Sequence, residues 1–145
     1  MLRNFTVILV VLASLAVGCK TADENRDSTT IKTKGGEQVT IGSRVPEELR
    51  KFAPPDGFQF ESGVSSSSGG IAMGSWKGRG NVETVLDFYR KSMTGQGWTE
   101  AGFLKAAGQN ILMYKKGDDA TNITVSQKGD EVNVEIMSGP AAKNQ

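Results

Sequence analysis

The sequence predicts an α+β domain in which one helix packs on an antiparallel sheet, in the order β-β-α-β-β-β, preceded by a small hairpin. Three observations predict this fold class. Residues 82–94 have the apolar spacing of an amphipathic helix. Several other segments alternate apolar and polar residues, as strands with one buried face do, and glycine-rich turns separate them. The 94 residues from Val45 to Ser138 are enough for one compact domain but not for two.

The first elements are a hairpin and a short helix. Residues 30–41 alternate around Gly35 and Gly36, a pattern typical of a two-residue hairpin turn. Because an isolated hairpin is only marginally stable in water, we expect this one to be stable only if it docks on the main sheet. Residues 45–52 can form one or two helical turns with Pro46 at the first position, and the two prolines that follow end them.

A second hairpin precedes the main helix. Residues 58–62 and 71–76 alternate as strands, and we expect the serine- and glycine-rich stretch 62–70 to be a flexible loop. Asn81 is a good N-cap for the helix over 82–94. The apolar stripe of this helix consists of Val82, Val85, Leu86, Tyr89 and Met93. Four alternating segments follow the helix, at residues 98–103, 111–115, 121–126 and 132–137.

The chain begins with a secretory signal that ends on its only cysteine. Arg3 is followed by an apolar run and by small residues up to Gly18, and the sequence after Cys19 is abruptly polar. The tetrapeptide AVGC at positions 16–19 resembles the lipobox of bacterial lipoprotein precursors. That resemblance implies cleavage between Gly18 and Cys19, a diacylglyceryl group on the cysteine sulfur, and an acyl chain such as palmitate on the new amine.

Two other interpretations of this first segment stay open. A plain signal peptide cut elsewhere would remove Cys19 or leave it as a free thiol. A retained transmembrane helix would need about twenty apolar residues, and this run is interrupted by Arg3, Asn4 and Thr6. The lipobox interpretation divides the chain into a signal peptide (1–18), a lipidated N-terminus with polar tether and hairpin (19–44), a small domain (45–138) and a tail (139–145).

The resemblance also carries an expectation about location. In lipoproteins of this kind an aspartate directly after the cysteine is the well-known signal for retention in the inner membrane, whereas this chain has Lys20. We therefore expect acyl chains on Cys19 to anchor the protein in the bacterial cell envelope. If the host is Gram-negative, the periplasmic face of the outer membrane is favoured.

Composition excludes several classes of function. The chain has no histidine and one cysteine, which excludes Ser-His-Asp and Cys-His catalysis and the usual zinc sites. Its 17 basic and 16 acidic residues alternate without a basic block, so we expect no nucleic-acid partner. The acidic pairs at 118–119 and 130–131 do not have EF-hand spacing. We expect no metal, no cofactor and no enzymatic activity.

Two non-catalytic functions stay open for the exported domain, beside the alternative of an enzyme that uses paired carboxylates such as Glu61 and Glu83. The first is a non-catalytic binding or envelope-assembly module with an envelope protein as its partner. The second is a small-ligand or lipid-binding module that uses a cleft between helix and sheet. For contact with a partner we single out the hairpin 58–76, with the exposed alternates Gln59 and Glu61 and the cations Lys77 and Arg79.

The glycine-rich segment between Gly74 and Gly80 admits two interpretations. It places glycines, Lys77 and Arg79 directly before the helix, where backbone N–H groups and the helix dipole can bind an anion. It matches neither the Walker pattern nor the dinucleotide fingerprint. The other interpretation is an ordinary glycine-rich turn between a strand and a helix.

Several short motifs together resemble a group of uncharacterised bacterial lipoproteins. These motifs are GGEQVTIG, Val45-Pro46-Glu47, Ala53-Pro54-Pro55-Asp56-Gly57, Phe88-Tyr89 and Gly97-Trp98. Members of that group combine a lipobox, a short tether and one small domain whose helix carries Phe-Tyr and ends in Gly-Trp. The resemblance covers most of residues 31–138, and it implies no catalytic residue. Only the lipid anchor carries over from it, onto Cys19.

Overall fold

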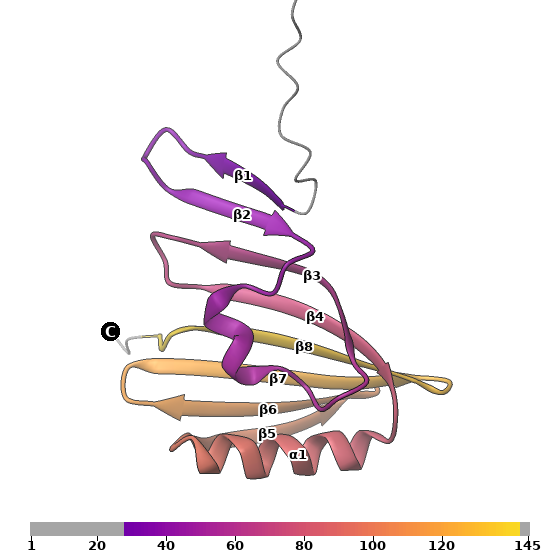
Figure 1. Ribbon diagram of the computed structural model, residues 1–145. Coiled ribbons are helices and arrows are strands. Elements are labelled where there is room, and N and C mark those ends of the chain that lie inside the picture. Colours follow the sequence, from indigo (N-terminus) through magenta and orange to yellow (C-terminus); the bar gives the residue numbers. More distant parts are fainter. Residues whose placement is uncertain (1–27, 143–145) are drawn as a thin grey trace, which may run out of the picture.

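One eight-stranded antiparallel sheet forms the body of the protein, in the order β1-β2-β3-β4-β8-β7-β6-β5 (Figure 1). The computed structural model describes residues 28–142, so the predicted signal peptide and Cys19 lie outside the described residues. The elements in chain order are β1 (Ser28–Lys32), β2 (Gln38–Gly42), the 3-10 helix η1 (Glu47–Phe52), β3 (Gln59–Ser66), β4 (Ala72–Arg79), α1 (Val82–Gly95), β5 (Thr99–Ala106), β6 (Gln109–Lys116), β7 (Asp119–Lys128) and β8 (Glu131–Pro140).

The predicted order β-β-α-β-β-β, with one helix on a simple α+β sheet, is wrong. It counted three strands after the helix, but all four alternating segments form strands there. It also left the first hairpin outside the sheet, whereas β2 pairs with β3 from Val39 opposite Ser66 to Gly42 opposite Gly63. The reason is that β3 has a partner on each side, β2 and β4, so the hairpin extends the same sheet.

The serine-rich stretch is mostly strand and not the flexible loop that we expected. Residues 62–66 continue β3, and residues 63–65 among them pair with both neighbouring strands, β2 and β4. The hydroxyl of Ser66 donates a hydrogen bond of 2.7 Å to Glu37 Oε1 in the β1–β2 turn. Hydrogen bonds from Ser68 and Ser66 hold the pKa of Glu37 below its ordinary value. The serines therefore help to tie the first hairpin to the sheet, because they satisfy a carboxylate at its turn.

Helix α1 forms where the sequence predicts it. The side chain of Asn81 caps it, since its Oδ1 accepts the N–H of Glu83 at 2.8 Å. The helix ends before Gly97, whose φ of +79° suits glycine because it has no Cβ. Its apolar stripe packs on the sheet over β5 and β7. The buried members of that stripe are Val85, Leu86, Tyr89 and Met93.

The short helix η1 covers the part of the same face that α1 does not reach. It buries Leu49 and Phe52 and contacts β4 and β8. The hydroxyl of Tyr89 donates a hydrogen bond of 3.2 Å to the carbonyl oxygen of Phe52, so the two helices meet. The ring of Phe52 also meets Trp98 edge-on, with 5.4 Å between centroids. We call the face under these helices the inner face.

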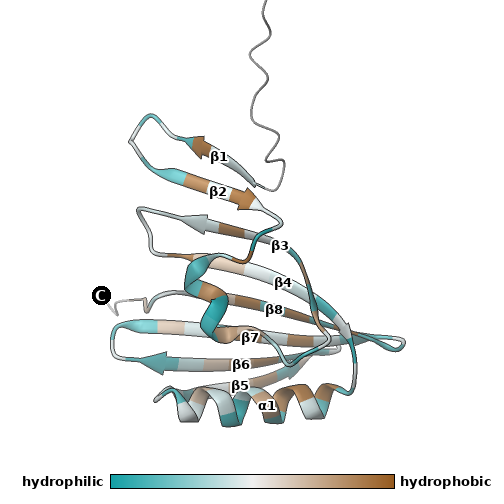
Figure 2. Ribbon diagram, viewed as in Figure 1, coloured by the Kyte–Doolittle hydropathy of each residue, from teal (hydrophilic) through white to brown (hydrophobic). Residues whose placement is uncertain are grey.

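The opposite face of the sheet, which we call the open face, has no helix on it within residues 28–142. The first hairpin lies far from α1, and its brown, apolar stretches are visible on β1 and β2 in Figure 2. The core is therefore confined to one side of the sheet. The buried sheet residues of the inner face include Leu112, Tyr114, Ile123, Val125, Val132, Val134 and Ile136.

The two tyrosines of the chain should give the domain a measurable alkaline limit. Burial raises the pKa of Tyr89 strongly. The pKa of Tyr114 is raised to about 12, chiefly by burial and also by the carboxylate of Glu100, while the charge of Arg90 lowers it. Both folded values exceed the value of about 10 for an unfolded tyrosine. The stabilisation is therefore complete below about pH 10 and is lost as the pH rises from there through the folded pKa.

We expect Tyr114→Phe to reduce that alkaline loss of stability, measured by urea unfolding at pH 8 and at pH 11. At pH 8 its free energy of unfolding should stay within about 0.5 kcal/mol of wild type, because the buried hydroxyl of Tyr114 makes no hydrogen bond of ordinary geometry. Tyr89→Phe is the matched variant, and at pH 8 it should cost about 0.5–1.5 kcal/mol because it removes the bond to Phe52. Equal costs at pH 8 would contradict this difference.

Candidate ligand-binding site

The open face carries a row of apolar side chains that runs across the strands. The strand register places Ile41 opposite Val64, Val64 opposite Met73, and Met73 opposite Met137. The row then passes through Asn122 on β7 and reaches Met113 on β6. We call these residues the apolar row: Ile41, Val64, Met73, Met137 and Met113, interrupted by Asn122. Directly opposed residues of adjacent strands pack side by side, so the row forms one continuous surface.

Exposed apolar area is concentrated on this face. Eight large apolar side chains of residues 28–142 are exposed, and the strand alternation puts six of them on the open face; Ile71, just before β4, lies there too, beside Gly139 of β8. Only Phe103 lies on the inner side, where Arg90 stacks over its ring. Such a concentration on one surface marks an interaction or ligand site. The seven are Ile31, Ile41, Val64, Ile71, Met73, Leu104 and Met137.

A hollow of about 530 Å³ lies on the open face, and we call it the apolar hollow. Five adjacent strands, β3, β4, β8, β7 and β6, contribute to its lining. Its apolar lining comes from Val64, Met73, Ile111 and Met137, with polar groups between them. Apolar walls with a few convergent polar groups are typical of small-molecule sites of this volume. The polar side chains that line it are Ser62, Ser75, Asn122, Thr124 and Glu135.

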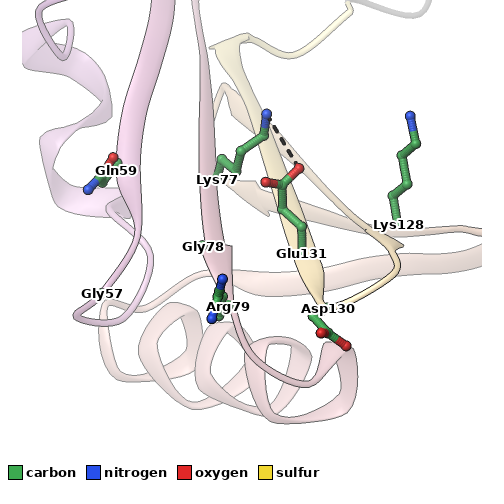
Figure 3. Close-up of a pocket in the computed structure, with 8 residues that line it drawn as sticks. All are labelled: Gly57, Gln59, Lys77, Gly78, Arg79, Lys128, Asp130 and Glu131. Carbon is green, nitrogen blue, oxygen red and sulfur yellow. Dashed lines mark ion pairs between the residues drawn. The ribbon is translucent and has the colours of Figure 1, made fainter.

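A second hollow of about 550 Å³, the charged hollow, lies further along the same strands (Figure 3). Its lining consists of Gly57, Gln59, Lys77, Gly78, Arg79, Lys128, Asp130 and Glu131. Ser75 of the apolar hollow and Lys77 of the charged hollow point to the same side of β4, about 7 Å apart along the strand. The two hollows are therefore neighbours, and the open face changes from charged to apolar along the strand direction.

Lys77 is the most strongly paired charge of this region. Its Nζ lies 3.1 Å from Glu61 Oε1 and 3.4 Å from Glu131 Oε1, and Figure 3 shows the second of these pairs. Hydrogen bonds to Glu61 and then to Glu131 raise the pKa of Lys77 above its ordinary value. The amine therefore stays protonated at neutral pH. It cannot act as a nucleophile or a general base in that state.

The structure brings the four predicted binding residues together at one end of the open face. Gln59, Lys77 and Arg79 line the charged hollow. Glu61 occupies an irregularity in the pairing of β3 with β4, between Phe60 and Ser62, from which it reaches Lys77. The apolar row was not predicted from the sequence. Its signal was present, because several strands have adjacent apolar residues and so have apolar side chains on both faces. The adjacent residues are Ala72-Met73, Ile111-Leu112-Met113 and Ile136-Met137.

The segment Gly74–Gly80 is neither an anion-binding loop nor a turn. Most of it belongs to β4, which pairs on both sides. On the inner face a Cβ at Gly74 would lie 2.9 Å from Leu49 Cδ1, and one at Gly78 would lie 2.7 Å from the ring of Phe58. These glycines are therefore needed because large side chains pack directly on the strand.

The cleft between helix and sheet, where we expected a ligand, is filled by side chains. Tyr89, Leu86 and Met93 of α1 are each at most 1% exposed, and Leu112 beneath them is fully buried. Both hollows described above lie on the opposite side of the sheet. Within residues 28–142 no group of three or more acidic, histidine or cysteine residues could hold a metal ion. No helix in that range is long and apolar enough to cross a membrane.

A family model described as START domain-like matches residues 59–139, from the first residue of β3 almost to the end of β8. The chain belongs to the START domain-like family. No curated protein matches the chain. START-like domains have a helix-grip fold and generally bind ligands, so the simple α+β class predicted from the sequence is replaced by this one.

Membership of the START domain-like family separates the two functions that the sequence left open. It favours a ligand- or lipid-binding module over an envelope-assembly module. The match contains all the strands that line the apolar hollow, while β1, β2 and η1 lie outside it. The START-like part of the chain therefore holds the candidate site, and the first hairpin is an addition at its edge.

We expect Gly78→Ala to destabilise the domain, which tests the interpretation of the glycine-rich segment. The added Cβ would enter the ring of Phe58 on the inner face, and overpacking of this kind costs about 1–3 kcal/mol. Gly80→Ala is the matched control, because nothing lies within 4 Å of its Cβ. Urea unfolding measures both variants. Equal stabilities would show that β4 does not need a glycine at position 78.

Proposed function

We propose that this chain is a lipid-anchored protein of the cell envelope whose START-like domain binds an apolar or amphipathic small ligand without catalysing a reaction. The ligand occupies the apolar hollow of the open face. The observation that carries the proposal is this hollow of about 530 Å³, lined by methionine and aliphatic side chains, in a domain of a ligand-binding family.

The lining of the hollow supports a flexible apolar ligand. Methionine side chains are unbranched and polarisable, so they adapt to chains of different shape. Met73 and Met137 are directly opposed and are 49% and 42% exposed, which leaves both free to contact a ligand. Asn122, Thr124 and Glu135 can fix the polar end of the molecule by hydrogen bonds.

The sequence and the charged hollow support a non-catalytic role. The chain has no histidine, and its one cysteine is the residue proposed to carry lipid. The lysine nearest the apolar hollow is held as an ammonium ion by two carboxylates. An acid–base or nucleophilic mechanism needs a group that is close to its titration point at working pH, and Lys77 does not meet that need.

The anchor rests on the lipobox. Acyl chains on Cys19 hold the domain on its membrane, because two or more chains bind a bilayer stably where a single chain does not. Lys20 in place of aspartate favours the periplasmic face of the outer membrane in a Gram-negative host. The similarity to uncharacterised bacterial lipoproteins supports the same anchor.

Ligand binding is testable with a fluorescent long-chain fatty acid as the probe. We expect saturable binding with one molecule per chain, and an affinity lowered at least about tenfold by Met137→Lys, which places a charge in the apolar wall. Phe103→Lys is the matched control, because Phe103 is 43% exposed, close to the 42% of Met137, and lies on the other face. Equal binding by wild type and both variants would contradict the site.

Lipidation is testable by mass spectrometry of the mature N-terminal peptide. We expect a peptide that begins at Cys19 and carries a diacylglyceryl group and an amide-linked acyl chain. Cys19→Ser should move the protein from the membrane fraction to the soluble fraction, because the acyl chains are its attachment. An unmodified or missing Cys19 in the wild-type protein would contradict the anchor.

A further inference from the structure

We propose that the open face, extended by the β1–β2 hairpin, docks on the surface of the phospholipid bilayer that carries the anchor. The ligand then enters the apolar hollow directly from that bilayer. The inference rests on the lipid anchor and the ligand site of the proposed function, and it adds the source of the ligand.

The docked hairpin leaves only a short tether. The sequence predicted a polar tether with a possible hairpin up to residue 44, but β1 already begins at Ser28, nine positions after Cys19. Nine residues reach about 30 Å at most when fully extended. A domain held this close to a bilayer meets it at a high effective concentration, so even a weak affinity for the surface is sufficient for docking.

The tether enters the sheet beside the exposed apolar surface. Thr29 on β1 lies directly opposite Ile41, the first member of the apolar row. From β1 to Met137 on β8, the last residue before the interruption at Asn122, there are four strand spacings, which is roughly 20 Å. This part of the row is therefore within the reach of the tether from the anchor, so the open face can be presented to the membrane without unpairing β1.

Three isoleucines are exposed on this face and have no part in the ligand hollow. Ile31, Ile41 and Ile71 are 52%, 45% and 47% exposed, and none of them lines the apolar hollow. The hairpin that carries the first two contacts the rest of the domain chiefly through β3. A ligand bound in the hollow leaves these three side chains exposed to water. Docking on a bilayer surface would remove them from water, which is favourable for apolar groups.

The charges of the face indicate what kind of bilayer it fits. Lys77 is paired with two carboxylates, and the face also carries Asp130 and Glu135 beside Arg79, Lys128 and Lys115, so four cations stand against four carboxylates. A balanced surface gains little from anionic lipid. Docking therefore depends on apolar contact, and it should occur on zwitterionic phosphatidylcholine and change little with salt.

The experiment uses the lipidated protein in phosphatidylcholine vesicles that contain brominated acyl chains. Because the sulfur of Cys19 is acylated, one introduced cysteine can be labelled alone with a fluorophore. We expect bromine to quench a label at Ile41→Cys several-fold more than one at Phe103→Cys, a position with nearly the same exposure on the inner face. The difference should persist in high salt. Equal quenching at the two positions would overturn docking by the open face.

A second variant separates docking from ligand binding. Ile31→Lys should abolish the excess quenching at position 41, because it places a charge on the docking surface outside the hollow. It should leave the affinity for the soluble fatty-acid probe unchanged, measured on the Cys19→Ser protein. Unchanged quenching would overturn the proposed surface. If the Cys19→Ser protein without Ile31→Lys does not bind the probe, the ligand site is contradicted instead. If the lipidated protein does not insert into vesicles, both the anchor and the docking that depends on it are contradicted.

Discussion

The fold depends on the closure of the inner face by two helices that meet at Tyr89 and Phe52. Helix α1 covers the β5–β7 side and η1 covers β4 and β8, so neither alone would keep water from the core. The bond from Tyr89 to the carbonyl of Phe52 joins them where they meet, and Trp98 packs against the same ring. Because this face is filled so completely, it has no room for a ligand. Any binding surface of substantial apolar area must be on the other face.

The open face combines features that an isolated soluble domain normally avoids. It exposes seven large apolar residues and places three methionines in one row across the strands. Such a surface carries an aggregation risk, which the proposed lipid anchor would reduce because the bilayer would then be the nearest apolar surface. The charged hollow bounds this surface at one end, where Lys77 is neutralised by Glu61 and Glu131. One part of the open face is therefore apolar, and the neighbouring part carries charges of both signs.

Local features were predictable from the sequence. The N-cap at Asn81, the stripe of α1 and the four strands after it follow from patterns within a few residues of one another. The order of the strands in the sheet was not predictable, because β4 pairs with β8, about sixty residues away, and no local pattern specifies that partner. The serine run was misread for the same reason, since its strand conformation comes from neighbours on both sides. Gln59 and Glu61 were predicted as exposed alternates of a hairpin, and Lys77 and Arg79 as cations at its end; their role in binding stays a prediction. The apolar row could not be predicted in this way, because it is formed only by the register of six paired strands.

The position of β8 has a consequence for how the protein is made. This strand is synthesised after the other seven strands of the sheet, yet it lies inside the sheet between β4 and β7 and connects its two halves. The sheet therefore cannot close until β8 has been made, and before that point a growing chain has only partial hairpins. Until then β1–β4 and β5–β7 are two separate groups of strands, and neither group alone can bury the whole inner face.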